Sequence, residues 1–256
     1  MKTISQTRLG ILGGGQLGRM LIQEAINYNI SVSVLDPDTN APCKNICDQF
    51  VVGSLGDYNT VYNFGKNLDL ITIEIEKVNV EALEALEKEG VLVYPQPRVI
   101  RLIQDKGMQK QFFKENDIPT ADFQLINNHA QILESNFNFP LIQKLRKDGY
   151  DGKGVIKINN HGDISIAFDA PSLLEKCVDF EKEVAVIVAR NVDGQISVFP
   201  MVEMDFNPEA NLVEFLISPS EYPNHIQEQA RKIAAEIAVK LNIVGILAVE
   251  MFLLKL

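Results

Sequence analysis

Short apolar runs alternate with stretches of helical spacing through the first hundred residues. The apolar runs cover residues 8–13, 31–36, 68–75 and 91–95. This alternation favours a parallel sheet covered by helices. We therefore predict an α/β domain over residues 1–98. Its helices are expected to begin at Gln16, Tyr58 and Val80, with Asn79 as an N-cap and Gly90 just past the end of the third helix.

After Pro119 the pattern changes to many short apolar runs separated by Gly, Asn, Asp and Pro. This texture is typical of an antiparallel α+β domain, which we place at residues 99–256. A helical segment over residues 96–120 leads into it, with Gly107 as the expected interruption, and an amphipathic helix opens at Pro223. The expected strands cover residues 121–126, 140–145, 154–158, 183–191, 196–204, 212–218 and 245–256.

The composition limits the classes of partner. The formal net charge of -10 would repel nucleic acid phosphates, since the sequence shows no concentrated basic face. No window reaches about 18 uninterrupted apolar residues, and the N-terminus lacks a signal-peptide pattern. We therefore expect no nucleic acid or membrane partner and a cytoplasmic location. The three cysteines lack the number and spacing of a zinc site, so reduced thiols are expected.

A glycine-rich turn lies between the first predicted strand and the first predicted helix. Gly13, Gly15 and Gly18 have the spacing G-x-G-x-x-G, and Asp36 ends the next apolar run. These features meet the dinucleotide-binding fingerprint, so an NAD-dependent oxidoreductase is one hypothesis. Against it, the second domain shows no residues arranged for hydride transfer.

A second glycine-rich segment lies between two strand-like runs and carries Gly149, Gly152 and Gly154. Glycine lets backbone N–H groups approach an anion closely, and Lys144 and its neighbouring cations supply positive charge. These features predict a phosphate-binding loop in a hairpin. The loop is not a P-loop, because G-x-x-x-x-G-K-[ST] is absent. The alternative is an exposed turn with solvated lysines.

Several carboxylates are placed where ligands bind. Glu74 and Glu76 are predicted to share one face at the carboxyl end of a parallel strand, where open α/β sheets bind ligands. Glu175 precedes a predicted linker and Glu183 begins a strand, so both are expected to face a cleft. Solvated charges at strand ends are the alternative.

Glu250 interrupts the last apolar run, which we expect to be a buried strand. An ionised carboxylate there is costly unless it is paired or binds a metal, so Glu250 is a candidate metal ligand. The alternative is an edge-strand glutamate that faces solvent. Because termini usually lie in exposed segments, we also expect the second domain to be incomplete at its C-terminus.

The segments GGGQLGRML, TIEIEKV, DKGMQKQFF, KLRKDGYDGKGV, EKCVDFEKEVAV and GILAVEMF follow one another in this order. Together they resemble the ATP-grasp enzymes of purine biosynthesis over essentially the whole chain. The resemblance implies a pre-ATP-grasp domain with a Rossmann-like parallel sheet, followed by an α+β ATP-grasp domain. It implies that the first glycine turn faces a ribonucleotide substrate instead of a dinucleotide, and that the protein is a homodimer.

The resemblance also implies roles for individual residues. Lys144, Asp151 and Lys153 would be catalytic, and Glu250 would hold Mg²⁺, for which Mn²⁺ can substitute. The substrate contacts would be Gly15, Gln16, Leu17 and Glu74. The ATP contacts would be Lys106 and Lys144, the loop residues Gly149, Tyr150, Asp151, Gly152, Lys153, Gly154 and Val155, the hinge residues Glu175, Lys176, Cys177 and Val178, and Glu183 on the ribose.

The implied activity is ATP-dependent carboxylation of aminoimidazole ribonucleotide by bicarbonate. Bicarbonate is a poor electrophile, so the γ-phosphoryl group would first form carboxyphosphate, with the second glycine loop as a lid that excludes water. Two departures qualify the resemblance: Lys106 stands where the family often has Arg, and a second glutamate ligand for the metal has no counterpart in the chain. A formate-dependent glycinamide ribonucleotide transformylase and a non-catalytic nucleotide-binding remnant are further alternatives.

Overall fold

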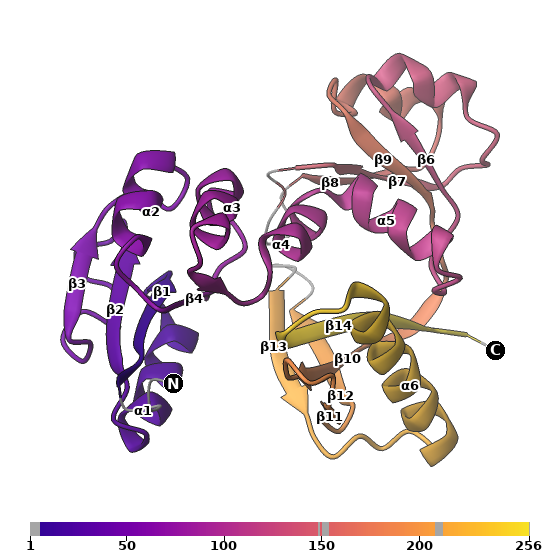
Figure 1. Cartoon of the computed structure of the whole chain (residues 1–256). Coiled ribbons are helices and arrows are strands. Elements are labelled where there is room, and N and C mark those ends of the chain that lie inside the picture. Colours follow the sequence, from indigo (N-terminus) through magenta and orange to yellow (C-terminus); the bar gives the residue numbers. More distant parts are fainter. Residues whose placement is uncertain (1–5, 148, 150–153, 208–211, 256) are drawn as a thin grey trace. The chain divides into compact units, whose positions relative to one another are not determined.

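The structure is a computed structural model that describes residues 6–147, 149, 154–207 and 212–255. The chain divides into two compact units, Met1–Arg101 and Leu102–Leu256 (Figure 1). None of the helices in the described part of the chain has the length and apolar content needed to cross a bilayer.

The first unit consists of alternating strands and helices, and α4 leads out of it. Its elements are β1 (Arg8–Leu12), α1 (Gln16–Asn27), β2 (Ser31–Asp36), β3 (Gln49–Val52), α2 (Tyr58–Gly65), β4 (Leu70–Ile73), α3 (Val80–Lys88), β5 (Leu92–Val93) and α4 (Pro97–Gln104). The strands form one parallel sheet in the order β3-β2-β1-β4-β5, as the alternating pattern predicts. β3 is an edge strand that the sequence analysis did not predict.

The central strand β1 is buried on both faces of this sheet. Successive strand residues point to opposite faces. Ile11 therefore packs with Ile22 of α1 on one face, while Leu12 joins Leu83 of α3 on the other. The predicted ends of α3 are confirmed, since Asn79 accepts a hydrogen bond from the Ala82 N–H. This packing holds the turn after β1 rigidly at the carboxyl edge of the sheet.

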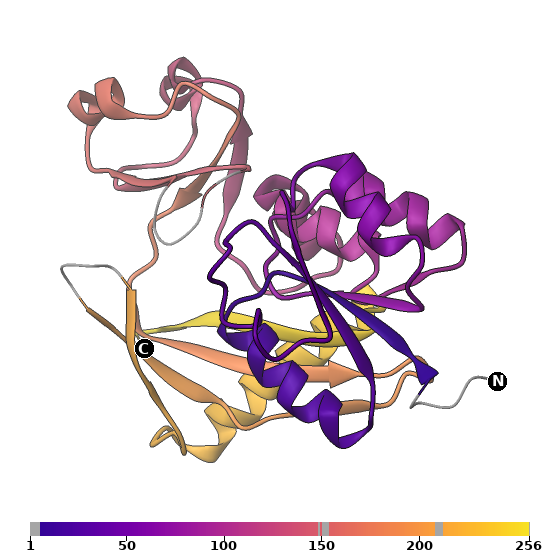
Figure 2. The ribbon, with the colours of Figure 1, turned by 90° about the vertical axis from the view of Figure 1, so that its left-hand side faces the viewer.

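The second unit contains two antiparallel sheets, as predicted. Its helices and strands are α5 (Lys106–Glu115), β6 (Phe123–Ile126), β7 (Leu141–Leu145), β8 (Val155–Ile158), β9 (Ser172–Lys176), β10 (Phe180–Arg190), β11 (Ile196–Val198), β12 (Val202–Asn207), β13 (Leu212–Ile217), α6 (Asn224–Leu241) and β14 (Gly245–Leu254). One sheet has the order β6-β9-β7-β8, and the other has the order β11-β10-β12-β13 with β14 paired to β10. Figure 2 shows α6 running along one face of the larger sheet.

Two expectations for the second unit are wrong. The helical segment is interrupted at Asp105, the N-cap of α5, and Gly107 lies inside that helix. β14 is not a buried strand: it pairs with β10 at an edge of the sheet, and alternate residues along it are exposed. Strand β9 was not predicted, although Glu175 within it does come just before the linker to β10, as expected.

The N-terminus of α5 is anchored by a buried carboxylate. One oxygen of Asp105 accepts hydrogen bonds from the N–H groups of Gly107 and Met108. Arg146, just after β7, binds both oxygens of Asp105 through Nε and a terminal nitrogen at 2.9 and 2.8 Å. Burial alone would raise the pKa of Asp105, but Arg146 and the helix N–H groups hold it below its usual value. The pair therefore fixes the start of α5 against the end of β7.

Asp105→Asn should lower the free energy of unfolding of the second unit by about 1.5–3 kcal/mol, because Asn caps a helix as well as Asp but cannot neutralise Arg146. Urea titration at pH 7 measures the loss. The loss should shrink as the pH falls below about 4, since the depressed pKa of Asp105 means that its stabilisation is present above that range and is lost on protonation.

Asp57→Asn is the matched control for this variant. Asp57 caps α2 in the same way, but it is exposed, and its side chain accepts hydrogen bonds from the N–H and hydroxyl of Thr60. It should change the unfolding free energy by less than about 0.5 kcal/mol. Equal losses in the two variants would contradict the role of the Arg146 charge.

Candidate functional site

The glycine turn after β1 already holds carboxylates. The Gly14 N–H donates to Oδ2 of Asp36 at 2.6 Å, and the Gly15 N–H donates to Oε2 of Glu74 at 3.3 Å. A Cβ added to Gly15 would lie 2.6 Å from the Glu74 carboxylate, so the Glu74 side chain would have to move for any other residue at this position. Gly13 has φ of 101°, the left-handed conformation that glycine adopts without strain.

These contacts change how the dinucleotide fingerprint is interpreted. In a dinucleotide-binding turn the backbone N–H groups face a pyrophosphate, and the acidic residue binds a ribose hydroxyl. Here the other oxygen of Asp36 accepts the Asp38 N–H at 2.7 Å, so both oxygens of Asp36 bind the protein's own backbone. With Glu74 beside Gly15, the turn presents negative charge where a pyrophosphate would have to lie. It favours a ligand that donates hydrogen bonds.

Other residues complete the turn. β4 ends at Ile73, so Glu74 and Glu76 follow the strand instead of sharing one of its faces, and that expectation is wrong. The Cys43 thiol donates to the Gly15 carbonyl at 3.5 Å, and burial raises the pKa of this thiol to about 11. All three cysteines of the chain are free. Gln16 and Leu17 begin α1, and the Leu17 side chain is exposed.

In the second unit, Lys144 lies in a cluster with Glu175 and Lys110. The Nζ atoms of Lys144 and Lys110 each lie 2.5 Å from a different oxygen of Glu175. The sheet register explains the first contact, because Lys144 pairs with Leu173 and Glu175 is two residues further along β9 on the same face. Lys110 reaches the cluster from α5, which packs against β9.

Glu175 is ionised within this cluster although its side chain is only 6% exposed. Burial alone would raise the pKa of Glu175, but the two ammonium groups, Lys144 first, hold it below the ordinary value. The cluster carries one negative and two positive charges. It therefore keeps a net positive charge where Lys144, 25% exposed, reaches the surface.

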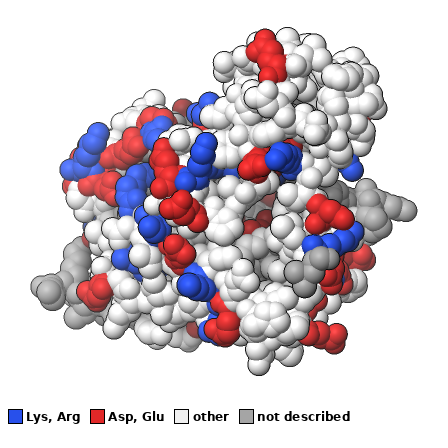
Figure 3. Space-filling view, turned by 90° about the vertical axis from the view of Figure 1, so that its right-hand side faces the viewer, with Lys and Arg blue, Asp and Glu red and all other residues white. Residues whose placement is uncertain are grey.

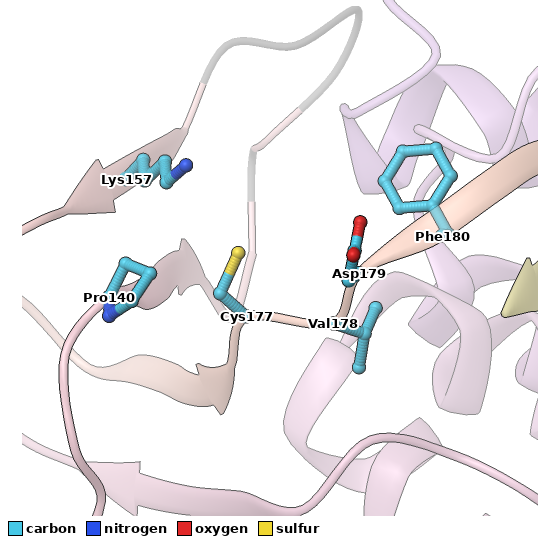
Figure 4. Close-up of a pocket in the computed structure, with 6 residues that line it drawn as sticks. All are labelled: Pro140, Lys157, Cys177, Val178, Asp179 and Phe180. Carbon is cyan, nitrogen blue, oxygen red and sulfur yellow. The ribbon is translucent and has the colours of Figure 1, made fainter. Parts of the chain in front are cut away.

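A pocket of about 370 Å³ lies beside the linker between β9 and β10 (Figure 4). Cys177, Val178, Asp179 and Phe180 line one side of it. Pro140, before β7, and Lys157 of β8 complete the lining, and the sulfur of Cys177 points into the space between them. The expected hinge thus consists of the last residues of β9 and the first residues after it.

Glu183 and Glu250 lie on one face of the larger sheet. Glu250 pairs with Ala185, so Glu183 is its diagonal neighbour on that face. Glu250 is exposed, which matches the edge-strand alternative. Burial, followed by the repulsion of Glu250, raises the pKa of Glu183, while Lys144 opposes the rise.

The described ends of the second glycine loop meet each other. The Leu145 N–H donates to the Gly154 carbonyl at 2.8 Å, and Gly154 has φ of 79°. A Cβ on Gly154 would lie 3.0 Å from the Gly149 Cα, so these two described ends of the loop lie close together. Lys106, the first residue of α5, donates its N–H to the Arg146 carbonyl at 2.9 Å. The candidates Tyr150, Asp151, Gly152 and Lys153 lie outside the described residues.

Sequence reasoning missed three residues of these sites: Cys43, Asp105 and Lys110. Lys110 carried a usable signal, since it stands four residues after Lys106 and so on the same helix face. Its carboxylate partner could not be identified, because the partner lies in a strand that was not predicted. In Figure 3, acidic and basic side chains are interspersed over part of the face shown, and large areas of that face carry neither.

Comparisons with known proteins agree with this geometry. Residues 6–104 match the ribonucleotide synthetase preATP-grasp domain, and residues 111–255 match the ATP-grasp domain. The chain is 32% identical to an N5-carboxyaminoimidazole ribonucleotide synthase from Brucella melitensis, covering 96% of this chain and 70% of that protein.

Solved structures are similar as well. N5-carboxyaminoimidazole ribonucleotide synthetase from Thermotoga maritima has a TM-score of 0.88 at 36% identity, covering 98% of this chain and 66% of that one. N5-carboxyaminoimidazole synthase from Aspergillus clavatus, in complex with ADP and 5-aminoimidazole ribonucleotide, has a TM-score of 0.89 at 32% identity, covering 99% and 67%. The chain spans only 26% to 48% of the length of several longer curated relatives.

Glu183→Gln should stabilise the second unit at pH 7. The raised pKa of Glu183 means that its ionised form costs folding stability above the unfolded value of about 4.3. The gain should vanish as the pH falls below that value, where the glutamate is protonated in both states. The melting temperature at pH 7 and at pH 4 measures it. Glu214→Gln, on the exposed strand β13, is the control and should change little at either pH; a destabilised Glu183→Gln at pH 7 would contradict the assignment.

Proposed function

Because the chain belongs to the N5-carboxyaminoimidazole ribonucleotide synthase family of ATP-grasp proteins, we propose that it carries the ATP site of a ligase that forms a C–N bond. The reaction is the carboxylation of 5-aminoimidazole ribonucleotide by ATP and bicarbonate in purine biosynthesis. The substrate assignment is supported by the Aspergillus clavatus relative, whose structure contains ADP and 5-aminoimidazole ribonucleotide.

The observation that carries this proposal is the position of Lys144. It lies on β7 just before the loop whose ends are Gly149 and Gly154, and its ammonium group contacts Glu175. A cation beside a glycine loop suits the phosphates of a nucleotide. The hinge pocket beside Cys177 and Val178 suits the adenine.

The reaction follows from the chemistry of these groups. An oxygen of bicarbonate attacks the γ-phosphorus, ADP leaves, and carboxyphosphate forms. Lys144 stabilises the charge on the transferring group, with the glycine loop, including Asp151 and Lys153, closing over it. The exocyclic amine of the ribonucleotide then attacks the carboxyl carbon and phosphate leaves. Water must be excluded, because it would hydrolyse the intermediate.

Mg²⁺ is the expected metal, with Mn²⁺ as a substitute. The described residues contain no group of three or more His, Cys, Asp or Glu side chains that could hold an ion by themselves. Glu250, exposed on β14, fits an ion that takes its other ligands from phosphates and water, as Mg²⁺ does at nucleotide sites. When bound, the metal would neutralise charge on the nucleotide phosphates.

The substrate side is assigned to the first unit. Gly15, Gln16, Leu17 and Glu74 lie at the turn, and the Glu74 carboxylate can accept hydrogen bonds from a ribonucleotide hydroxyl or amine. The carboxylates on this turn argue against the NAD hypothesis, because they occupy the N–H groups that a pyrophosphate needs. The formate-dependent transformylase is distinguished by supplying each amine with each one-carbon acid and measuring ADP release.

Further parts of this proposal follow from the family resemblance. The substrate-side domain spans residues 1–98 and the ATP-grasp domain spans residues 99–256. The protein acts as a homodimer in the cytoplasm. Sedimentation equilibrium of the full-length protein, which measures the molar mass of the assembly, tests the dimer.

In the full-length protein, ATP hydrolysis should require bicarbonate and aminoimidazole ribonucleotide together, or proceed weakly with bicarbonate alone. Lys144→Ala should reduce turnover by at least about 100-fold, because it removes a charge that stabilises the transferring group. Lys114→Ala, on the exposed side of α5, is the control and should leave turnover unchanged. A coupled ADP-release assay measures both, and wild-type turnover in Lys144→Ala would refute the phosphate assignment.

ADP should protect Cys177 from N-ethylmaleimide, since the thiol points into the hinge pocket. With ADP at about ten times its Kd, labelling of Cys177 should slow about tenfold, because only the free form reacts. Cys47 is half-buried like Cys177 but lies in the first unit, so its labelling rate is the internal control. Peptide mass spectrometry follows both thiols. Unchanged labelling of Cys177 would rule out the hinge as the adenine site.

A further inference from the structure

Lys110 occupies a position that the proposed reaction does not use. Its side chain is 13% exposed, and its Nζ contacts the oxygen of Glu175 that Lys144 does not contact. Besides Glu175, its Nζ donates to the Thr120 hydroxyl. A buried ammonium group costs free energy unless it is paired, so its place in the cluster calls for a physical reason.

The charge count of the cluster supplies that reason. If Lys144 were the sole counter-ion of Glu175, the buried carboxylate would neutralise it, and the pair would offer little attraction to phosphate. With Lys110 bound to the other oxygen of Glu175, the carboxylate is already compensated. Lys144 then keeps an uncompensated positive charge at the more exposed end of the cluster.

We propose that Lys110 is a positioning residue for the nucleotide phosphates: it neutralises Glu175 and thereby frees the charge of Lys144 for the γ- and β-phosphates. This inference rests on the proposed function for the identity of the ligand, but the ion-pair competition that it describes does not. Lys110 itself touches no substrate in this scheme. It acts on the nucleotide through Glu175 and Lys144.

A purely structural role of Lys110 makes a different prediction. If Lys110 only held α5 against β9, its loss would disturb the hinge and weaken every ligand that binds there. If it acts through the charge of Lys144, its loss should weaken only ligands that carry phosphates. Comparing ADP with adenosine therefore separates the two roles.

The first experiment measures binding of ADP and adenosine by calorimetry. Lys110→Met should weaken ADP about five- to twentyfold, as expected for partial loss of one charge near a surface, and leave adenosine unchanged. Lys110→Arg keeps the charge and should retain ADP affinity within about threefold. In the Glu175→Gln background, Lys110→Met should have no further effect, because the competition for Glu175 is gone. Lys114→Met removes an exposed lysine of the same helix and is the matched control.

The second experiment needs no nucleotide. Acetylation of Lys144 by sulfosuccinimidyl acetate should slow in Lys110→Met, because Lys144 then becomes the sole partner of Glu175, and should stay at the wild-type rate in Lys114→Met. Failure of the wild type to bind ADP would count against the proposed function alone, while this labelling result still decides the role of Lys110. Equal weakening of ADP and adenosine, full ADP affinity in Lys110→Met, or unchanged labelling of Lys144 would each overturn the inference.

Discussion

The ion-pair cluster of Lys110, Glu175 and Lys144 joins a helix and two strands through one buried carboxylate. A carboxylate at this depth is tolerated only when its charge is balanced by well-placed partners. Helix α5 and strands β7 and β9 must therefore be in place together before the cluster can form. Because α5 is also held at its start by Asp105 and Arg146, this pair and the cluster together fix both the helix and the strand that leads into the glycine loop.

In the first unit, carboxylates and not ammonium groups lie at the glycine-rich segment. Backbone N–H groups in its glycine turn form an anion site, and the protein fills that site with the carboxylates of Asp36 and Glu74. The turn keeps the backbone geometry of a dinucleotide site while its electrostatics are reversed. In the second unit the ammonium groups of Lys110 and Lys144 flank the buried carboxylate of Glu175, so the cluster keeps a net positive charge. The two glycine-rich segments thus favour different ligands because of which side chains other elements deliver to them.

Elements whose signals are local could be predicted from the sequence. The strand–turn–helix of β1 and α1, the Asn79 cap and the helix opened by Pro223 each depend on residues within a few positions of one another. The short strands β3 and β9 were missed, and β14 was expected to be buried, because strand burial depends on which neighbours cover each face. The expectation that Glu250 is buried was wrong for the same reason: it lies among the alternate residues of β14 that are exposed.

By itself the sequence determined the order of the two domain types, the parallel and antiparallel character of their sheets, and the candidates at the glycine turns, since periodicity and glycine spacing are local properties of the chain. Only the tertiary structure decided which charges meet. Asp36 accepts hydrogen bonds from the backbone of its own turn instead of being free for a ribose, and Glu175 is a buried carboxylate that contacts both Lys144 and Lys110. The physical reason is that sheet register and helix packing bring together residues that are distant along the chain, and no spacing within a motif encodes those contacts.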